Sequence, residues 1–307
     1  MEGRACKGPV SSICHAAELG AVVVGDTSGC VTVLDSVSGT KKREVVCENF
    51  VTAVAYAAGL RALISAEANM SKEVSKITVW DVDSGEKRAE MNYGQHLCSV
   101  VYAPELHSIV SGDGNFMKDK QTGRIVIWNA DTLEQHFKLP CACPVTSVAY
   151  APDMKAIFST DRSFAIICWD AESGSKRFET TAEQLPWCLA YAPELGALVV
   201  GESNFKAQAG WVRVLDAASG AVRFQLCEVE AAVVSLAFLP ELGAVACGDR
   251  AGKVSLWDIE ARDLRLERDT SGGPANAMTY DRVTRRLAVG TKSGNVRLWS
   301  IDELSGG

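Results

Sequence analysis

The sequence is built from seven copies of one two-part pattern, and this repetition constrains the fold more than any other feature. The first part is an apolar strand, a turn and a second apolar strand, as in VVYAPELHSIVS (100–111) and LAYAPELGALVV (189–200). The second part is a strand such as ITVWDVDSG, whose anchor position holds Leu34, Trp80, Trp128, Trp169, Leu215, Trp257 and Trp299. The anchors recur at intervals of 46, 48, 41, 46, 42 and 42 residues, which is the signature of a repeat architecture.

Each repeat predicts four short strands. Apolar and polar residues alternate through the segments, and a fourth segment such as TKKREVVCE (40–48) follows the anchor strand. Pro and Gly at the centre of the first part favour a tight turn. One four-stranded sheet leaves both of its faces exposed, whereas a ring of sheets lets each cover its neighbour. We therefore predict an all-β, seven-bladed β-propeller of four-stranded antiparallel blades.

The pairs Trp80-Asp81, Trp169-Asp170 and Trp257-Asp258 complete a pattern that resembles the WD-repeat β-propellers over residues 10 to 303. The resemblance implies a single domain over 1–307. Its repeats fall at about 10–50, 51–97, 98–144, 145–186, 187–232, 233–274 and 275–307 plus 1–9. The resemblance also implies that an N-terminal strand near residues 3–7 closes the last blade, because the last repeat lacks a fourth strand of its own.

The copies depart from the family in two respects. No repeat begins with Gly-His, and the family's turn Asp is missing six positions before each anchor. Those positions hold Ser28, Val74, Thr122, Ser163, Ala209, Ala251 and Ser293. We therefore expect the family's Asp-to-Trp hydrogen-bond network to be absent, which leaves packing and backbone pairing to hold the blades together.

Three repeats carry enlarged connections between their second and third strands. The inserts EANMSKE (67–73), DGNFMKD (113–119) and ESNFKAQ (202–208) share an acidic residue, an Asn, then Met or Phe, and a Lys. In WD-repeat propellers this connection lies on the top face, around the channel mouth. We predict a partner-binding surface there, formed by Asn69, Met70, Lys72, Asn115, Phe116, Lys118, Asn204, Phe205, Lys206 and Trp211. The alternative is that each Asn opens an Asx-turn and each apolar side chain packs into its own blade.

Other motifs do not predict a catalytic, cofactor or metal site. GDRAGKV (248–254) is one residue short between its glycines and lacks the Ser or Thr of a phosphate-binding loop. His136, Cys141 and Cys143 lie close together but lack a fourth zinc ligand. No Ser or Cys lies in a recognisable nucleophile elbow. Trp187 stands where sister repeats have a strand-opening Val, and we expect it to pack in the core. The alternative for Trp187 and Trp211 is an aromatic wall of a top-face pocket that takes a peptide side chain or a methylated cation.

Composition excludes several functional classes. The chain has 31 Lys and Arg against 38 Asp and Glu, which argues against nucleic acid as a partner and favours a partner with a basic segment. Most of the eleven cysteines fall in predicted strands, which is typical of an intracellular, cytoplasmic or nuclear protein. No apolar stretch is long enough to span a membrane, and the first residues lack an apolar signal segment.

These observations predict a non-enzymatic scaffold or adaptor that binds a protein or peptide on its top face. We expect it to be monomeric on its own and to work within a larger complex. Two alternatives stay open. One is an enzyme with its site in the channel, which needs convergent carboxylates, metal ligands or a nucleophile near the axis. The other is a substrate-recruitment domain of a larger regulatory protein.

Overall fold

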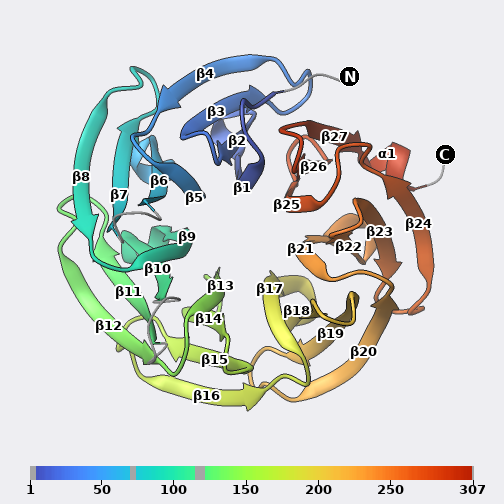
Figure 1. Cartoon of the computed structure of the whole chain (residues 1–307). Helices are drawn as coiled ribbons and strands as arrows, with labels where there is room; N and C mark the ends of the chain where they lie inside the picture. The colour runs from blue at the N-terminus through green and yellow to red at the C-terminus, as the bar shows by residue number, and fades with distance from the viewer. Residues whose placement is uncertain (1–4, 70–73, 115–121, 306–307) are drawn as a thin grey trace.

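Seven antiparallel sheets form a closed ring around a central channel, so the chain is a seven-bladed β-propeller, as the sequence predicted (Figure 1). The computed structural model describes residues 5–69, 74–114 and 122–305. Within these residues six sheets have four strands and the seventh has three. In every blade the strands follow chain order from the channel outward.

The elements have the following bounds. Blades 1 to 4 comprise β1 Val10–Ala16, β2 Ala21–Asp26, β3 Cys30–Asp35, β4 Lys41–Val46; β5 Phe50–Ala57, β6 Ala62–Asn69, β7 Val74–Asp81, β8 Lys87–Tyr93; β9 His96–Ala103, β10 Ser108–Gly114, β11 Gly123–Asn129, β12 Gln135–Cys141; β13 Val145–Ala151, β14 Ala156–Asp161, β15 Ala165–Asp170 and β16 Lys176–Thr181. Blades 5 to 7 comprise β17 Leu185–Ala192, β18 Ala197–Asn204, β19 Ala209–Asp216, β20 Val222–Val229; β21 Val233–Leu239, β22 Ala244–Asp249, β23 Lys253–Asp258, β24 Leu264–Asp269; β25 Ala275–Asp281, β26 Arg286–Thr291 and β27 Val296–Ser300. The helical turns are η1 Ala17–Leu19, η2 Ala58–Leu60, η3 Pro104–Leu106, η4 Pro193–Leu195, η5 Pro240–Leu242 and α1 Ile301–Leu304.

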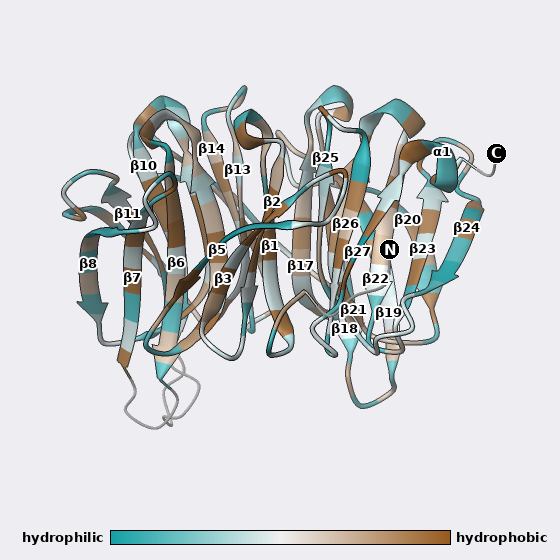
Figure 2. Cartoon of the chain, turned by 90° about the horizontal axis from the view of Figure 1, so that it is seen from above, coloured by the Kyte–Doolittle hydropathy of each residue, from teal (hydrophilic) through white to brown (hydrophobic). Residues whose placement is uncertain are grey.

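The alternation of strand direction gives the disc two different faces. The connections between first and second strands, such as η3 and η4, lie on one face, which we call the turn face. The connections between second and third strands, and those between blades, lie on the opposite face, which we call the loop face. The hairpin between β18 and β19 projects from the loop face at the lower edge of Figure 2. The strand ends that border the three enlarged connections therefore all lie on one side of the molecule.

Apolar packing between blades holds the ring together. The second strands, such as β2, are buried along their whole length because neighbouring blades cover both of their faces. Outer strands such as β24 instead alternate between exposed and half-buried residues. Seven apolar clusters of described residues each join two adjacent blades. Val10 of blade 1 and Ala288 of blade 7, for example, share the cluster that closes the ring.

The N-terminal segment reaches the edge of blade 7 at the place where we expected a closing strand. The N–H of Cys6 donates to the carbonyl of Gly294 at 3.0 Å, just as Cys47 donates to Gly29 where the fourth strand of blade 1 ends. Among the described residues, however, no strand pairs with the outer edge of β27. Residues 1–4 lie outside that part of the chain. Within the described residues, the Cys6 hydrogen bond and the apolar contact of Cys6 thus link the N-terminal segment to blade 7.

Part of the side-chain network that we expected to be missing is present in three blades. There the indole N–H of the anchor donates to a serine on the second strand. The pairs are Trp80 with Ser65 at 2.9 Å, Trp128 with Ser111 at 2.8 Å and Trp169 with Ser159 at 2.9 Å. Blades 1 and 5 have a leucine anchor, and they carry Val24 and Val200 at the serine position. The anchor and its partner position are therefore chemically matched in these five blades.

A buried acid lies at or close to the end of the second strand in six blades, and in blades 1, 4 and 6 it accepts N–H groups of the turn that follows. These acids are Asp26, Glu67, Asp113, Asp161, Glu202 and Asp249, and Thr291 takes their place in blade 7. In blade 4, Asp161 Oδ1 accepts the N–H groups of Ser163 at 2.8 Å and Ala165 at 3.3 Å. The expectation that packing and backbone pairing alone hold the blades was wrong. In the short turns the acid lies two positions earlier than we assumed, at the end of the strand.

Blade 6 breaks the match between anchor and partner, and this supports a prediction. The buried indole Nε1 of Trp257 has no acceptor among the described residues, because Cys247 occupies the serine position. Cys247→Ser should supply the missing acceptor and raise the free energy of unfolding by about 1 kcal/mol. Urea denaturation measures the change. Cys168→Ser is the matched control: it buries a hydroxyl between Phe158 and Phe178 and should destabilise the chain. Equal effects of the two variants would contradict the assignment.

Candidate functional site at the channel mouth

Two adjacent cavities open along the axis of the ring. One lies at the mouth on the loop face and has a volume of about 660 Å³. The other lies within the channel and has a volume of about 650 Å³. The residues that line both are Ser11, Thr27, Trp187, Val234 and Asn276. The hollow at the mouth is therefore continuous with the channel.

A one-residue bulge in every first strand aims a side chain at this axis. The strand pairing of β17 with β18 skips Trp187, and the other six blades skip a residue at the same place. The seven bulge residues are Ser11, Thr52, Cys98, Thr146, Trp187, Val234 and Asn276, and all of them line the channel cavity. A bulge redirects the side chain of its extra residue. Repeat geometry thus builds a ring of seven side chains, of which only Trp187 is large.

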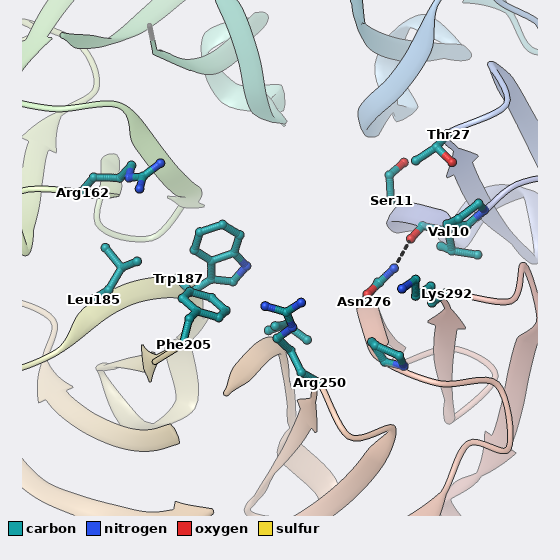
Figure 3. Close-up of a pocket in the computed structure, with 13 residues that line it drawn as sticks. Val10, Ser11, Thr27, Arg162, Leu185, Trp187, Phe205, Arg250, Asn276 and Lys292 are labelled. Atoms are coloured by element: carbon teal, nitrogen blue, oxygen red, sulfur yellow. Dashed lines mark hydrogen bonds between the residues drawn. The ribbon is translucent and has the colours of Figure 1, made fainter. Parts of the chain in front are cut away.

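Trp187 and Phe205 form an aromatic wall on blade 5. Their ring centroids are 5.0 Å apart with an interplanar angle of 78°, which is an edge-to-face contact. Trp187 is 36% exposed, so the expectation that it packs in the core was wrong, because the bulge turns it out of the blade. Arg250 of blade 6 lies over the free side of Phe205, with Cζ 5.4 Å from the ring centroid. Figure 3 shows these three side chains gathered on one side of the hollow.

Three further residues at the mouth are basic, and the sequence patterns did not predict them as site residues. Arg162, Arg250 and Lys292 line the 660 Å³ cavity, and each directly follows the residue that ends a second strand. The N–H of each donates to a carbonyl in the connection that enters the same blade. The acceptors are Pro144 at 3.0 Å, Ala232 at 3.0 Å and Pro274 at 3.1 Å. Aligning the repeats at that one position would have revealed the three cations in the sequence.

The predicted site residues of blade 5 differ in whether they line the cavity at the mouth. Phe205 lines the cavity at the mouth. Asn204 follows the alternative, because its Oδ1 accepts the N–H groups of Lys206 at 3.2 Å and Ala207 at 3.0 Å in an Asx-turn. Lys206 is exposed on this turn and lines neither cavity. Trp211 is half-buried on β19 and also lines neither of them. Blade 5 therefore contributes one predicted residue, Phe205, to the hollow.

The other predicted residues belong to blades 2 and 3. Asn69 ends β6, where its Nδ2 donates to Asn49 Oδ1 at 2.9 Å and ties the loop to the connection between blades. The remaining predictions lie outside the described residues; they are Met70, Lys72, Asn115, Phe116 and Lys118. The acids that begin the three inserts, Glu67, Asp113 and Glu202, are all buried within the last three residues of their strands. The acidic residue of the shared pattern is therefore part of the blade core.

The lining of the channel has few groups suited to acid–base or nucleophilic chemistry. Among the described residues, none that lines either cavity is an Asp or a Glu. Cys98 and Cys188 line the channel, and burial raises the pKa of the Cys98 thiol to about 12 and that of the Cys188 thiol even further. Neither thiol is therefore an activated nucleophile at neutral pH. Across the described residues, no group of three or more His, Cys, Asp or Glu is arranged to hold a metal ion.

The cysteines and the helices add two further facts. All eleven cysteines are free thiols, and eight of them are buried. The chain therefore uses cysteine as a small apolar residue, as expected from its position in strands. None of the helices in the described part of the chain has the length and apolar character needed to cross a membrane.

Comparison with known proteins gives one weak sequence similarity. No protein-family model matches the chain. Telomerase protein component 1 from Mus musculus is 26% identical over 138 residues, which cover 44% of this chain and 5% of that relative. The chain thus spans a small fraction of the relative's length. This sequence similarity is too weak to assign the chain to a family. Its architecture is that of a seven-bladed β-propeller, similar to the WD-repeat propellers.

Proposed function

We propose that this chain is a non-catalytic interaction scaffold that binds a peptide segment of a protein partner at the channel mouth. The observation that carries the proposal is the aromatic wall of Trp187 and Phe205 beside a 660 Å³ hollow. A large, partly exposed aromatic side chain next to a concave surface is typical of a peptide-binding anchor site. The rigid ring holds this wall in place without requiring a partner.

Exposed aromatic residues favour the loop face as the binding face. Phe50, Phe164 and Trp187 are 50%, 39% and 36% exposed, and all three lie on that face. The exposed large apolar residues of the turn face are aliphatic, for example Val37 and Val283. Aromatic residues are enriched at protein interfaces relative to the rest of the surface. This distribution therefore supports the loop face.

Phe164 provides a second, independent reason. It has φ 71°, at a turn position that Gly29, Gly252 and Gly294 occupy in other short-turn blades with φ between 84° and 96°. A left-handed conformation costs a residue with a side chain roughly 1–2 kcal/mol, a cost that glycine avoids. Strain of this kind is most often retained at functional sites. An exposed phenylalanine in this conformation supports a role for its ring at the surface.

The enlarged loops of blades 2, 3 and 5 extend the proposed surface around the mouth. Phe205 is the loop residue that lines the hollow, and Asn204 holds its turn. We keep the other loop residues as proposed contacts with the partner: Asn69, Met70, Lys72, Asn115, Phe116, Lys118, Lys206 and Trp211. The loops from three blades would let the partner contact a wider area than the hollow alone.

The proposal extends to the setting in which the scaffold works. A monomeric chain of this kind would act within a larger complex, in the cytoplasm or nucleus, where its eleven free thiols stay reduced. The lack of carboxylates in both cavity linings, together with the raised pKa of the Cys98 and Cys188 thiols, supports a non-catalytic role. A role in recruiting a substrate to a larger regulatory protein is one form of the same function.

Peptide display tests the proposal. A phage library of random twelve-residue peptides is panned in parallel on the full chain, on Trp187→Ala and on Phe137→Ala. Phe137 is the matched control, because it is also an aromatic residue with 36% exposure but lies on the outer strand β12. We expect peptides that bind the wild-type chain and Phe137→Ala, and lose roughly tenfold or more in affinity for Trp187→Ala. Circular dichroism confirms that the variants are folded.

Two results would count against the proposed function. One is a panning that enriches no peptide on the wild-type chain. The other is a set of enriched peptides that bind Trp187→Ala as tightly as Phe137→Ala, which would place binding away from the channel mouth.

A further inference from the structure

We propose that the channel mouth takes an acidic peptide segment, rich in Asp and Glu, with an apolar side chain seated against Trp187 and Phe205. This inference rests on the proposed function and names the chemistry of its partner. It comes from the arrangement of three cations, Arg162, Arg250 and Lys292, around the same hollow.

The repeat places the three cations at equivalent points of blades 4, 6 and 7. Each backbone N–H is held by a carbonyl of its own blade's entry connection, so the residue has a fixed position beside the channel. All three side chains are exposed. Thr27 occupies the same point in blade 1, where its N–H donates to the Pro9 carbonyl at 2.9 Å. Four short turns therefore present one neutral and three positive side chains to a single cavity.

Among the described residues that line this cavity, none is an Asp or Glu that could balance Arg250 and Lys292. The acids that precede Arg162 and Arg250 in sequence, Asp161 and Asp249, are buried and accept the N–H groups of their own turns. Neither Arg250 nor Lys292 forms an ion pair with a carboxylate in the described part of the chain. Figure 3 shows Arg162 and Arg250 on the side of the aromatic wall and Lys292 across the hollow. An extended peptide crossing the mouth would pass between them.

Arg250 lies where a ligand could meet both a positive charge and an aromatic ring. Its guanidinium lies over Phe205, and this contact orients the group before a ligand arrives. A guanidinium in this position can pair with a carboxylate in two parallel hydrogen bonds, while the ring beneath contacts an apolar side chain. The aromatic wall and the charge therefore favour a mixed acidic and apolar segment.

The net charge of the whole chain instead predicts a partner with a basic segment. With seven more acidic than basic residues, the chain repels polyanions at long range. Three cations are few for a nucleic acid, whose binding depends on neutralising many phosphates. A short acidic peptide contacts only the local field at the mouth. The cavity lining therefore favours an acidic protein segment over both a basic segment and a nucleic acid.

The test uses the peptide most enriched on the wild-type chain in the panning described above. It is synthesised with a fluorescent label, next to a version in which every Asp and Glu is replaced by Asn or Gln. Fluorescence anisotropy at 50 mM and 500 mM salt then measures both peptides on the wild-type chain and on Arg162→Gln/Arg250→Gln. The charge control is Lys155→Gln/Arg282→Gln, which removes the same charge from exposed positions on the turn face.

We expect the enriched peptide to be acidic and to bind about tenfold more tightly than its amide version, with a preference that shrinks at high salt. Arg162→Gln/Arg250→Gln should lose about tenfold in affinity for the acidic peptide, while the charge control stays within about twofold. An enriched peptide that is neutral or basic, or equal losses in both double variants, would overturn the inference. The proposed function would still stand if Trp187→Ala abolished binding of such a peptide. Tighter, Arg250-dependent binding of a twelve-residue thymidine oligonucleotide would also overturn it, in favour of nucleic acid.

Discussion

Gly290→Val should lower the free energy of unfolding by about 3 kcal/mol, because the glycine lies where the last blade meets the first. A Cβ at Gly290 would lie 2.3 Å from Val10 Cγ1 and 2.8 Å from Ile13 Cδ1, both on β1. Val10 and Ile13 are buried in the cluster that joins blades 7 and 1, so they have little room to move. Overfilling a packed core commonly costs 1–3 kcal/mol, and valine adds three carbons at this point.

The control for this experiment is Gly94→Val. A Cβ at Gly94 meets no atom within 4 Å, and this glycine is exposed, so the same substitution should change stability by less than about 0.5 kcal/mol. Adding Val10→Ala to Gly290→Val should recover part of the loss, because it removes Val10 Cγ1, the atom nearest to the new Cβ. Urea denaturation midpoints measure all four proteins. Equal midpoints for the two valine variants would mean that the ring is not tightly closed at this junction.

Trp128→Ala should be the most damaging single truncation in the core, with a loss of about 3–5 kcal/mol. The Trp128 side chain is fully buried, meets Tyr93 edge-on at a centroid distance of 5.4 Å, and donates its indole N–H to Ser111. Alanine would leave a cavity in the cluster shared by blades 2 and 3, and would also leave the Ser111 hydroxyl without its indole donor.

Two other blades suggest a second substitution that should compensate for part of the loss of Trp128. Blades 1 and 5 combine a leucine anchor with a valine at the serine position, so Trp128→Leu/Ser111→Val copies a pairing that the fold already uses. We expect this double variant to be clearly more stable than Trp128→Ala, and more stable than Trp128→Leu alone, since no buried hydroxyl is left without its partner. A double variant no better than Trp128→Leu would show that anchor and partner position are not coupled. Thermal and urea unfolding of the four proteins decide the point.

The fold could be predicted from the sequence because repeat period, strand alternation and turn residues all point to the same architecture. The shared patterns around Trp80 and Trp169, for example, fix both the strand and its place in the blade. The buried acids were missed because the family pattern directed attention to Ser163, whereas the acid of that turn is Asp161. A hydrogen-bonding role can be kept while the residue that performs it shifts along the turn.

The candidate site was harder to predict from the sequence than the fold. Phe205 could be found because its insert has a recognisable composition. For Trp187 the sequence left core packing and an aromatic wall as alternatives, since a strand bulge decides where its side chain points. Arg162, Arg250 and Lys292 are far apart in the sequence, and only closure of the ring brings them to one cavity. Net charge sums the whole surface, whereas a ligand meets the charges around one hollow, so the basic partner expected from net charge and the acidic partner proposed from the cavity lining are separate predictions.

The distribution of cysteines offers a practical means of observing how the ring opens. The eleven thiols are free, and eight of them lie on strands, in blades 1, 3, 4, 5 and 6, with none on the strands of blades 2 and 7. Cys141 and Cys227 are buried, which raises the pKa of their thiols and shields them from solvent, so an alkylating reagent reaches them only when their blade separates from its neighbour. Mass spectrometry of briefly alkylated chain would therefore report, blade by blade, which part of the disc loosens first. The native sequence already carries the probes for that measurement.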